Sequence, residues 1–225
     1  GFTDKEEQLL GLSHREDSSV FARLESYPCN RGFDEHHGII WGVASYFDPF
    51  SLVHNEQAIT EVPEDFYLTD FITEKSNELI DQSSGDDKPF FLYVAYTSPH
   101  WPLHAPEENI EKYRGVYDKG WDALRRDRYE RMLAMGLFDQ EKAPLAPNDA
   151  NLKWEDCENK SWEARHMEAH AGMVDRMDQG IGMIIEKLRE KGELENTFLL
   201  FLNDNGASFE RGYGPGFDRP GHTRN

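Results

Sequence analysis

The sequence predicts an α/β fold with a mostly parallel central sheet flanked by helices. Residues 88–97 and 197–202 are short apolar runs rich in aromatic and branched side chains, which is typical of strands buried on both faces. A predicted helix and a short turn precede each run. Helix–turn–strand units of this kind build parallel sheets, so the two runs are expected to lie in one sheet.

The first part of the chain supplies one short strand and one helix. Residues 1–30 are polar and predict a surface connection, and Ile39–Val43 predicts a short strand. Asp70–Ile80 predicts a helix on apolar spacing, because its apolar side chains recur on one face. Thr69 or Asp70 is expected to cap this helix, since a side-chain oxygen there accepts an orphan backbone N–H.

The second part of the chain is more helical. Residues 107–118 and 119–135 predict helices, and the polar, proline-containing residues 139–160 predict a loop. A long amphipathic helix follows, with Gly192 as its C-terminal stop. Residues 207–225 are rich in glycine and predict an excursion over the edge of the sheet. The apolar positions of the long helix recur at steps of three or four: Met167, Ala171, Val174, Met177, Ile181, Ile184, Ile185 and Leu188.

Composition excludes two classes of partner. The 225 residues carry 43 acidic and 24 basic side chains, a net charge of −19, which argues against nucleic acid because phosphate contacts need clustered Lys and Arg. No apolar run reaches the roughly 18 residues of a membrane span. The two cysteines, Cys29 and Cys157, make no disulfide framework, although a single bridge between them stays open.

Polar side chains follow both predicted strands at their carboxyl ends. His100 comes just after residues 88–97, and Asp204 and Asn205 follow residues 197–202. Ligands of open α/β sheets gather at this edge, so these side chains are expected to lie on one edge of one sheet. A histidine that exchanges protons near neutrality, beside hard oxygen ligands suited to Ca²⁺ or Mg²⁺, indicates metal-assisted chemistry on an anion.

Each candidate also has a structural interpretation. Asp204 and Asn205 suit a turn, and His100 suits a loop histidine bonded to backbone. His104 is either structural or faces substrate. His166 and His170 form H-x-x-x-H on a helix, a spacing that can bind zinc, but the order lacks the glutamate of H-E-x-x-H and favours a polar helix face. The His36-His37 pair shows no partner pattern in the sequence.

Taken together, six motifs in order resemble the sulfatases of the alkaline-phosphatase superfamily. The resemblance spans nearly the whole chain. The segments that carry it are Arg31-Gly32-Phe33-Asp34 with Gly38, Tyr67-Leu68-Thr69-Asp70, Pro99-His100-Trp101-Pro102, Gly120-Trp121-Asp122, Met173-Val174-Asp175-Arg176-Met177-Asp178 and Asp204-Asn205-Gly206.

The resemblance implies an active site with a proton-donating histidine, a calcium ion and a formylglycine nucleophile. His100 matches the histidine that contacts the sulfate and helps to protonate the leaving alcohol. Asp204 and Asn205 match ligands of Ca²⁺, which is preferred over Mg²⁺, and the other ligands fall near the family's N-terminus. The family's nucleophile is a formylglycine made in a C-x-P-S-R-type motif. Neither Cys29 nor Cys157 lies in such a motif, so formylglycine is expected outside this chain.

The expected protein is therefore a calcium-dependent sulfuric ester hydrolase, resembling the arylsulfatases. Residues 1–225 are expected to be an internal part of a single sulfatase catalytic domain, cut at both ends and inactive alone. Small-molecule or glycan sulfate esters are the expected substrates, in a periplasmic, secreted or lysosomal compartment. A phosphodiesterase or phosphonate hydrolase of the same superfamily, or a non-catalytic sulfatase-like binding protein, are the alternatives, because fold alone does not fix function.

Overall fold

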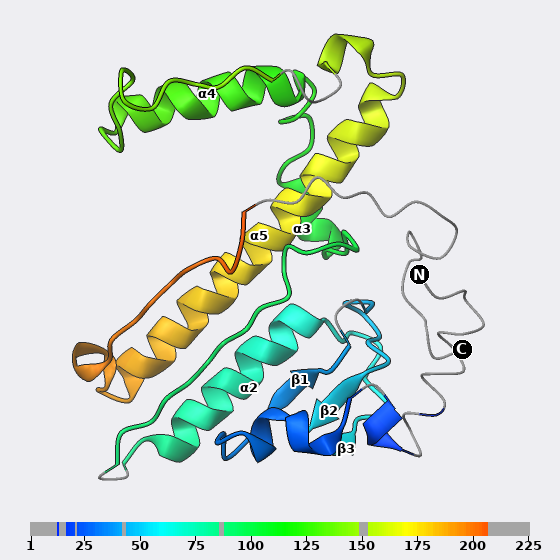
Figure 1. Ribbon diagram of the computed structural model, residues 1–225, viewed down its shortest axis with the longest axis vertical. Coiled ribbons are helices and arrows are strands. Elements are labelled where there is room, and N and C mark those ends of the chain that lie inside the picture. The colour runs from blue at the N-terminus through cyan, green and yellow to red at the C-terminus, as the bar shows by residue number, and fades with distance from the viewer. Residues whose placement is uncertain are drawn as a thin grey trace. The chain divides into compact units, whose positions relative to one another are not determined.

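The computed structural model describes residue 13 and residues 17–20, 22–41, 44–85, 88–148 and 153–206 (Figure 1). The chain divides into two compact units. The first comprises residues 1–104 and 174–225, and the second comprises residues 105–173. One long helix, α5 (Lys160–Glu190), contributes residues to both units. The predicted excursion at 207–225 lies outside the described residues, as do Gly42 and Val43 of the predicted strand at 39–43.

The first unit opens with three short 3-10 helices and a small antiparallel sheet. The 3-10 helices are η1 (Ser18–Val20), η2 (Leu24–Ser26) and η3 (Pro28–Asn30), where a surface connection was predicted. The sheet has the order β1-β2-β3, with β1 at His37–Ile39, β2 at Leu52–His54 and β3 at Gln57–Ala58. In its register His37 lies opposite His54, and Val53 lies opposite both Gly38 and Ala58.

Helix α2 (Leu68–Ser83) confirms the predicted helix at 70–80 and is longer than predicted by a little over one turn, counting both ends. The predicted cap is wrong. Tyr67 occupies the N-cap position and makes no side-chain cap bond. The Asp70 carboxylate instead accepts two hydrogen bonds of 2.7 Å from Arg176 of α5, so the attraction of a distant guanidinium outweighs local capping.

The apolar core of the first unit lies between α2, α5 and residues 90–96. Ile80, Ile184 and Leu188 form its buried centre, and alternate side chains of the segment pack against them: Phe90, Leu92, Val94 and Tyr96. Gly180 permits the close approach of α5, because a Cβ built there would lie 2.4 Å from Thr73 Oγ1 and 2.8 Å from the Tyr96 hydroxyl. These two oxygens hydrogen-bond to each other at 2.7 Å.

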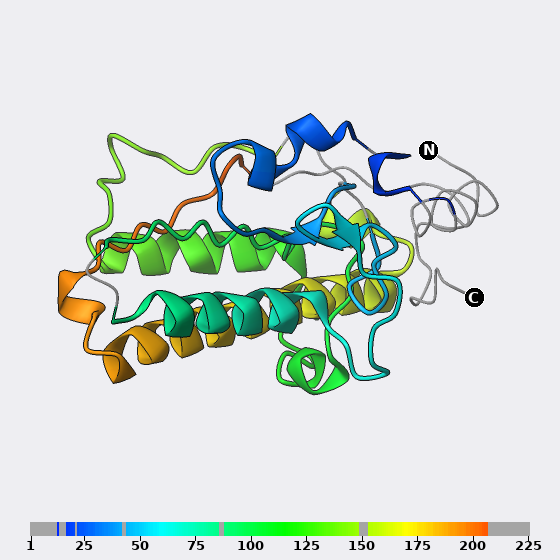
Figure 2. The ribbon, with the colours of Figure 1, turned by 90° about the horizontal axis from the view of Figure 1, so that it is seen from below.

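The predicted parallel central sheet is not confirmed. Residues 88–97 and 197–202 pair in no strand ladder within the described parts of the chain, where the antiparallel β1-β2-β3 sheet is found. Side chains from Phe90 to Tyr96 alternate between half-buried and exposed, which is the period of extended chain. Figures 1 and 2 show the two segments running in the same direction along α5.

The C-terminal end of α5 confirms the predicted glycine stop. Gly192 has φ +73°, a left-handed conformation that glycine adopts without strain. Its N–H donates to Arg189 O at 3.0 Å, and Glu193 N–H donates to Leu188 O at 2.9 Å. This pair of bonds is a Schellman motif. The short 3-10 helix η5 (Leu194–Asn196) then leads into residues 197–202.

The second unit contains α3 (Glu107–Glu111), α4 (Gly120–Ala134) and the 3-10 helix η4 (Trp154–Asp156) beside the first part of α5. The helix predicted at 107–118 stops early, because residues 112–119 form turns and Gly115 has φ +76°. Trp154 packs edge-on against Trp121 with ring centroids 4.8 Å apart. Gly120 lies so close to the Trp154 ring that no side chain fits between them.

No helix in the described parts of the chain is long and apolar enough to cross a bilayer. Cys29 and Cys157 are both free, so the bridge left open by the sequence does not form in this structure.

Candidate active site

The exposed histidine after residues 88–97 has one ring nitrogen fixed and one available. His100 Nδ1 lies 2.6 Å from the carbonyl oxygen of Trp101. A carbonyl oxygen only accepts, so Nδ1 carries the hydrogen and Nε2 of the neutral ring holds the lone pair. Nε2 has no hydrogen-bond partner among the described residues, and it is therefore the atom that can take up or release a proton.

The backbone around His100 is held on both sides. Its N–H donates to Thr97 O at 2.9 Å, and its carbonyl oxygen accepts the Tyr46 hydroxyl at 3.0 Å. The flanking Ser98-Pro99 and Trp101-Pro102 peptide bonds are both cis. Fixed φ at the two prolines and these hydrogen bonds restrict where the imidazole can point, as a proton-transfer group requires.

Two buried tyrosines donate hydrogen bonds to the backbone of this loop. The Tyr67 hydroxyl donates to His104 O at 2.9 Å, while that of Tyr46 donates to His100 O. Burial raises the pKa of Tyr67 to about 12, and burial also raises the pKa of Tyr46. Both phenols therefore stay neutral donors at any physiological pH.

His104 packs among these aromatic rings. Its Nδ1 accepts the Tyr46 backbone N–H at 3.4 Å, and its ring stacks on Phe47 with centroids 5.7 Å apart. A backbone N–H only donates, so Nδ1 is the acceptor nitrogen of this ring. Of the two interpretations left open by the sequence, these contacts favour the structural one.

Asp204 and Asn205 are exposed at the end of the second predicted strand. Asp204 Oδ1 accepts the Asn205 N–H at 3.0 Å, and Asn205 Nδ2 donates to Gly206 O at 2.6 Å. Both side chains make only such local contacts within the described residues. Within the described residues, no hydrogen bond or ion pair joins Asp204 or Asn205 to His100. The expected position of all three at one edge of a sheet therefore stays a prediction.

The donors of this pair suit calcium in kind. Asp204 offers carboxylate oxygens, and Asn205 offers its amide oxygen, since its hydrogen bond to Gly206 O is donated by the NH₂ group. Ca²⁺ takes about six to eight oxygen ligands. Among the described His, Cys, Asp and Glu side chains, the group of three that can hold a metal lies elsewhere, so further ligands are needed at Asp204.

That other group was missed in the sequence. Glu35, His37 and His54 bring three donor atoms within 4.8 Å of one another. The spacing Glu-x-His was the available signal, since residues two apart share a face of extended chain. The third ligand comes from strand pairing, which the sequence does not display. The second pair considered, His166 and His170, joins no such group among the described residues; His166 packs edge-on against Trp162 at 4.4 Å between centroids.

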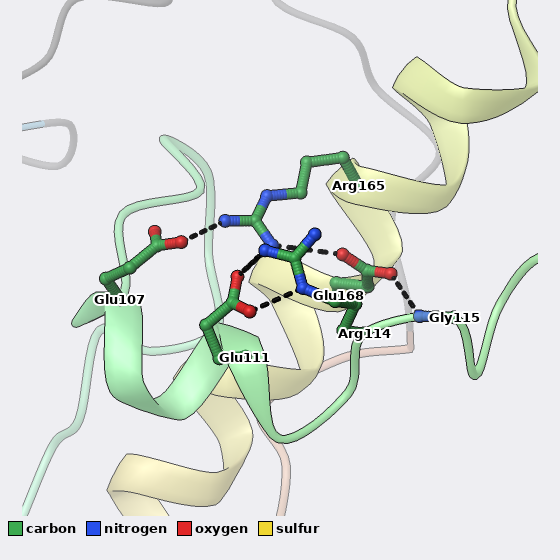
Figure 3. Close-up of polar contacts among 6 residues, drawn as sticks. All are labelled: Glu107, Glu111, Arg114, Gly115, Arg165 and Glu168. Carbon is green, nitrogen blue, oxygen red and sulfur yellow. Dashed lines mark hydrogen bonds and ion pairs between the residues drawn. The ribbon is translucent and has the colours of Figure 1, made fainter.

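Arg165 of the second unit carries a charge that could bind an anion, but carboxylates already contact its guanidinium group. Its guanidinium contacts Glu107 at 2.5 Å, Glu111 at 3.2 Å and Glu168 at 3.1 Å (Figure 3). The buried Glu168 also accepts the Gly115 N–H at 2.8 Å. This network joins α3 and the turn after it to α5, and it leaves Arg165 no spare charge for a sulfate.

Glu111 of this network is paired with two arginines, Arg114 and Arg165. The Arg114 guanidinium forms a bidentate pair with Glu111, and with Arg165 it lowers the pKa of Glu111 to about 2. Glu111 is thus ionised at any physiological pH. Its role is to hold two arginines rather than to exchange protons.

Two of the sequence motifs serve the fold. In Tyr67-Leu68-Thr69-Asp70 the carboxylate is paired with Arg176, which belongs to the motif at 173–178. In Gly120-Trp121-Asp122 the carboxylate accepts the Trp154 N–H at 3.0 Å and the Asn148 amide at 2.7 Å. These contacts explain both motifs without catalysis.

This combination of a fixed loop histidine and oxygen donors after apolar segments fits hydrolases that act on charged esters. The family description "Sulfatase" matches residues 12–224. The chain belongs to the sulfatase family.

Individual relatives agree with this membership. An uncharacterized sulfatase of Schizosaccharomyces pombe is 36% identical over 203 residues, which cover 81% of this chain and 36% of the relative. The arylsulfatase of Klebsiella aerogenes is 30% identical over 198 residues, 83% of this chain and 42% of the relative. The chain thus spans between a third and a half of the length of these curated relatives. The solved structure of Ps i-CgsB in complex with k-i-k-neocarrahexaose has a TM-score of 0.48 at 23% identity, covering 75% of this chain and 31% of that one.

Proposed function

We propose that the full-length protein hydrolyses sulfate esters, with His100 as the residue that protonates the leaving alcohol. The observation that carries this proposal is the state of the His100 ring. Nδ1–H is committed to the Trp101 carbonyl, and Nε2 is left exposed to solvent. Family membership over residues 12–224 supports the choice of a sulfate ester as substrate class.

The proton transfer follows from the ring's two nitrogens. In the protonated ring Nε2–H points away from the Trp101 contact and is free to donate to an oxygen. As the bond from sulfur to the ester oxygen breaks, that oxygen gains negative charge and takes the proton. The neutral ring that remains keeps its Nδ1 bond, so it needs no reorientation before it is protonated again.

We further propose that Asp204 and Asn205 bind Ca²⁺ together with ligands beyond the described residues. Calcium would supply positive charge to the sulfate oxygens when bound. Formylglycine is the nucleophile that the family resemblance implies. Neither Cys29, in η3, nor Cys157, buried beside Trp154 and Ala164, stands in a C-x-P-S-R-type motif, so we expect the nucleophile from another segment.

Both extended segments are proposed to join one parallel sheet in the full-length protein. Their common direction along α5 supports this arrangement (Figures 1 and 2). It would bring the His100 loop and Asp204 to one edge, since the carboxyl ends of parallel strands meet there.

The decisive experiment compares leaving groups in the full-length protein. His100→Ala should lower kcat for an alkyl sulfate by about 10²–10⁴-fold, the usual size of a general-acid contribution. The loss should be much smaller for 4-nitrophenyl sulfate, whose leaving group needs little protonation. His166→Ala, which changes a histidine on α5 that packs edge-on against Trp162, is the matched control and should leave both rates unchanged. An equal loss on both substrates would remove His100 as the proton donor.

The calcium proposal has its own measurement. Asp204→Ala should lower calcium affinity and activity together, and excess Ca²⁺ should restore part of the activity, because only one ligand is lost. Isothermal titration and metal analysis report the affinity. Retained stoichiometric Ca²⁺ in Asp204→Ala would assign the ion to other residues.

A substrate panel separates the alternatives. Faster turnover of a bis-aryl phosphate or a phosphonate monoester than of any sulfate ester would move the protein to the phosphodiesterase or phosphonate hydrolase class. Binding of sulfated glycans without turnover would make it a non-catalytic member of the family.

A further inference from the structure

A second cluster of metal-ligating side chains lies on the small antiparallel sheet of the first unit. Glu35 Oε1 is 2.8 Å from His37 Nε2 and 3.1 Å from His54 Nε2. The two imidazole rings are stacked, with centroids 4.2 Å apart and planes 7° apart. Both Nε2 atoms therefore lie within hydrogen-bond distance of the same carboxylate oxygen, and the three possible ligand atoms lie within 4.8 Å of one another.

The backbone builds this convergence. His37 of β1 and His54 of β2 are register partners, so their side chains lie on the same face. Asn55, directly after β2, locks the pairing from the end: its Oδ1 accepts the His36 N–H at 2.9 Å, and its N–H donates to His36 O at 2.8 Å. Glu35, two residues before His37, contacts the Nε2 atoms of both rings.

We propose that Glu35, His37 and His54 form a binding site for Zn²⁺ or a similar transition-metal ion, separate from the calcium ligands proposed at Asp204. Two imidazole nitrogens and one carboxylate oxygen are a common zinc donor set. Ca²⁺ and Mg²⁺ prefer oxygen ligands alone and are disfavoured here.

The distances suit the small change that metal binding requires. Ligand atoms at about 2.0–2.1 Å from a tetrahedral ion lie about 3.3 Å from one another. The two carboxylate–imidazole distances of 2.8 and 3.1 Å need to lengthen by a few tenths of an ångström, and the nearly parallel rings must tilt so that the lone pair of each Nε2 points at the ion. On binding, the ion takes the place of the Nε2 hydrogen: in a neutral ring this hydrogen moves to Nδ1, and in a protonated ring, which already carries a hydrogen on Nδ1, the Nε2 proton leaves to solvent.

Exposure of the cluster leaves a route for the ion. The His37 side chain is 11% exposed, Glu35 is 31% exposed and His54 is 45% exposed. A metal can therefore enter from the His54 side, while His37 anchors the site in the fold. Three protein ligands leave a fourth position for water.

The competing interpretation is a plain ion pair between Glu35 and the histidines, and a metal titration separates the two. The full-length protein is stripped with a chelator, saturated with Ca²⁺ to occupy any calcium site, and titrated with Zn²⁺ and, separately, with Co²⁺. One equivalent should bind. Co²⁺ should give the visible absorption of a tetrahedral site, and Zn²⁺ should raise Tm, because binding to the folded state stabilises it.

Variants identify the ligands. His37→Ala and His54→Ala should each weaken Zn²⁺ binding by about 100-fold or more, since a first-sphere ligand contributes at least as much as a supporting contact. The half-exposed His54 serves as the substitution least able to disturb folding. His36→Ala, the neighbouring histidine outside the cluster, is the matched control and should bind Zn²⁺ normally, as should Asp204→Ala. Absence of one-equivalent binding in the unaltered protein, or unchanged binding in His54→Ala, would overturn the proposal.

Discussion

The close approach of α5 to α2 makes a quantitative prediction at Gly180. A methyl group there would lie 2.4 Å from Thr73 Oγ1 and 2.8 Å from the Tyr96 hydroxyl, both far inside contact distance. Forcing such a group into a packed site costs about 1–3 kcal/mol. Disturbing the 2.7 Å hydrogen bond between the two oxygens costs about 1 kcal/mol more. Alanine regains about 1 kcal/mol of helix propensity, so Gly180→Ala should destabilise the protein by about 1–3 kcal/mol.

Gly182 provides the matched control on the same helix. A Cβ at Gly182 meets nothing within 4 Å, so Gly182→Ala should keep the propensity gain and stabilise the protein by up to about 1 kcal/mol. The two variants should differ by roughly 3 kcal/mol, which corresponds to about 6–12 °C in Tm for a domain of this size. Urea unfolding and thermal melts measure both quantities. Equal stability of the two alanine variants would refute the helix packing described for this unit.

Two further predictions concern polar side chains that are partly or fully buried. A double-mutant cycle on Asp70→Ala and Arg176→Ala should give a coupling of about 1–2 kcal/mol in urea unfolding, because the pair is bidentate and only one-third exposed; a coupling near zero would show an ordinary surface pair. Because burial raises the pKa of Tyr67 to about 12, its contribution to stability is fully present below the unfolded pKa near 10 and is lost as pH rises through about 12. Tyr67→Phe should therefore flatten the alkaline fall in stability, measured as Tm against pH; an unchanged slope would contradict the neutral buried phenol.

Local patterns were enough to predict the helices of the first unit. The three-to-four spacing of apolar residues marked α5, and the Schellman bonds at Gly192 explain why a glycine ends it. The helix at 68–83 was also predicted from spacing. The cap at its start was predicted wrongly, because Asp70 is paired with Arg176, which is 106 residues away in sequence.

Local sequence patterns could not predict which strands pair or which metal-ligating side chains come together. Residues 88–97 were predicted as a strand buried in a parallel sheet, and the structure shows chain there that pairs in no ladder among the described residues and leaves Phe91 and Tyr93 exposed. The identity of a strand's neighbours depends on residues far along the chain. For the same reason the sequence did not predict the cluster at His37, because only the register of β1 with β2 brings His54 next to His37. His100 was selected because it follows the predicted strand at 88–97 and matches a family motif, and its catalytic role stays a prediction. The ring nitrogen that has no partner among the described residues became clear only from the contact of Nδ1 with Trp101.

The exposure of the run at 197–202 has a consequence for handling the 225-residue chain by itself. Phe198 is 87% exposed, and the next four residues, Leu199–Leu202, are 49–71% exposed, with no charge or proline among them. Six-residue windows of this composition are the ones that stack into intermolecular β-structure. Glu195 and Asp204 flank the window and act as electrostatic gatekeepers, since like charges on stacked copies repel. Salt screens the charges of these carboxylates, so a higher ionic strength is expected to promote self-association, and solutions of the chain should be more stable against aggregation at low ionic strength.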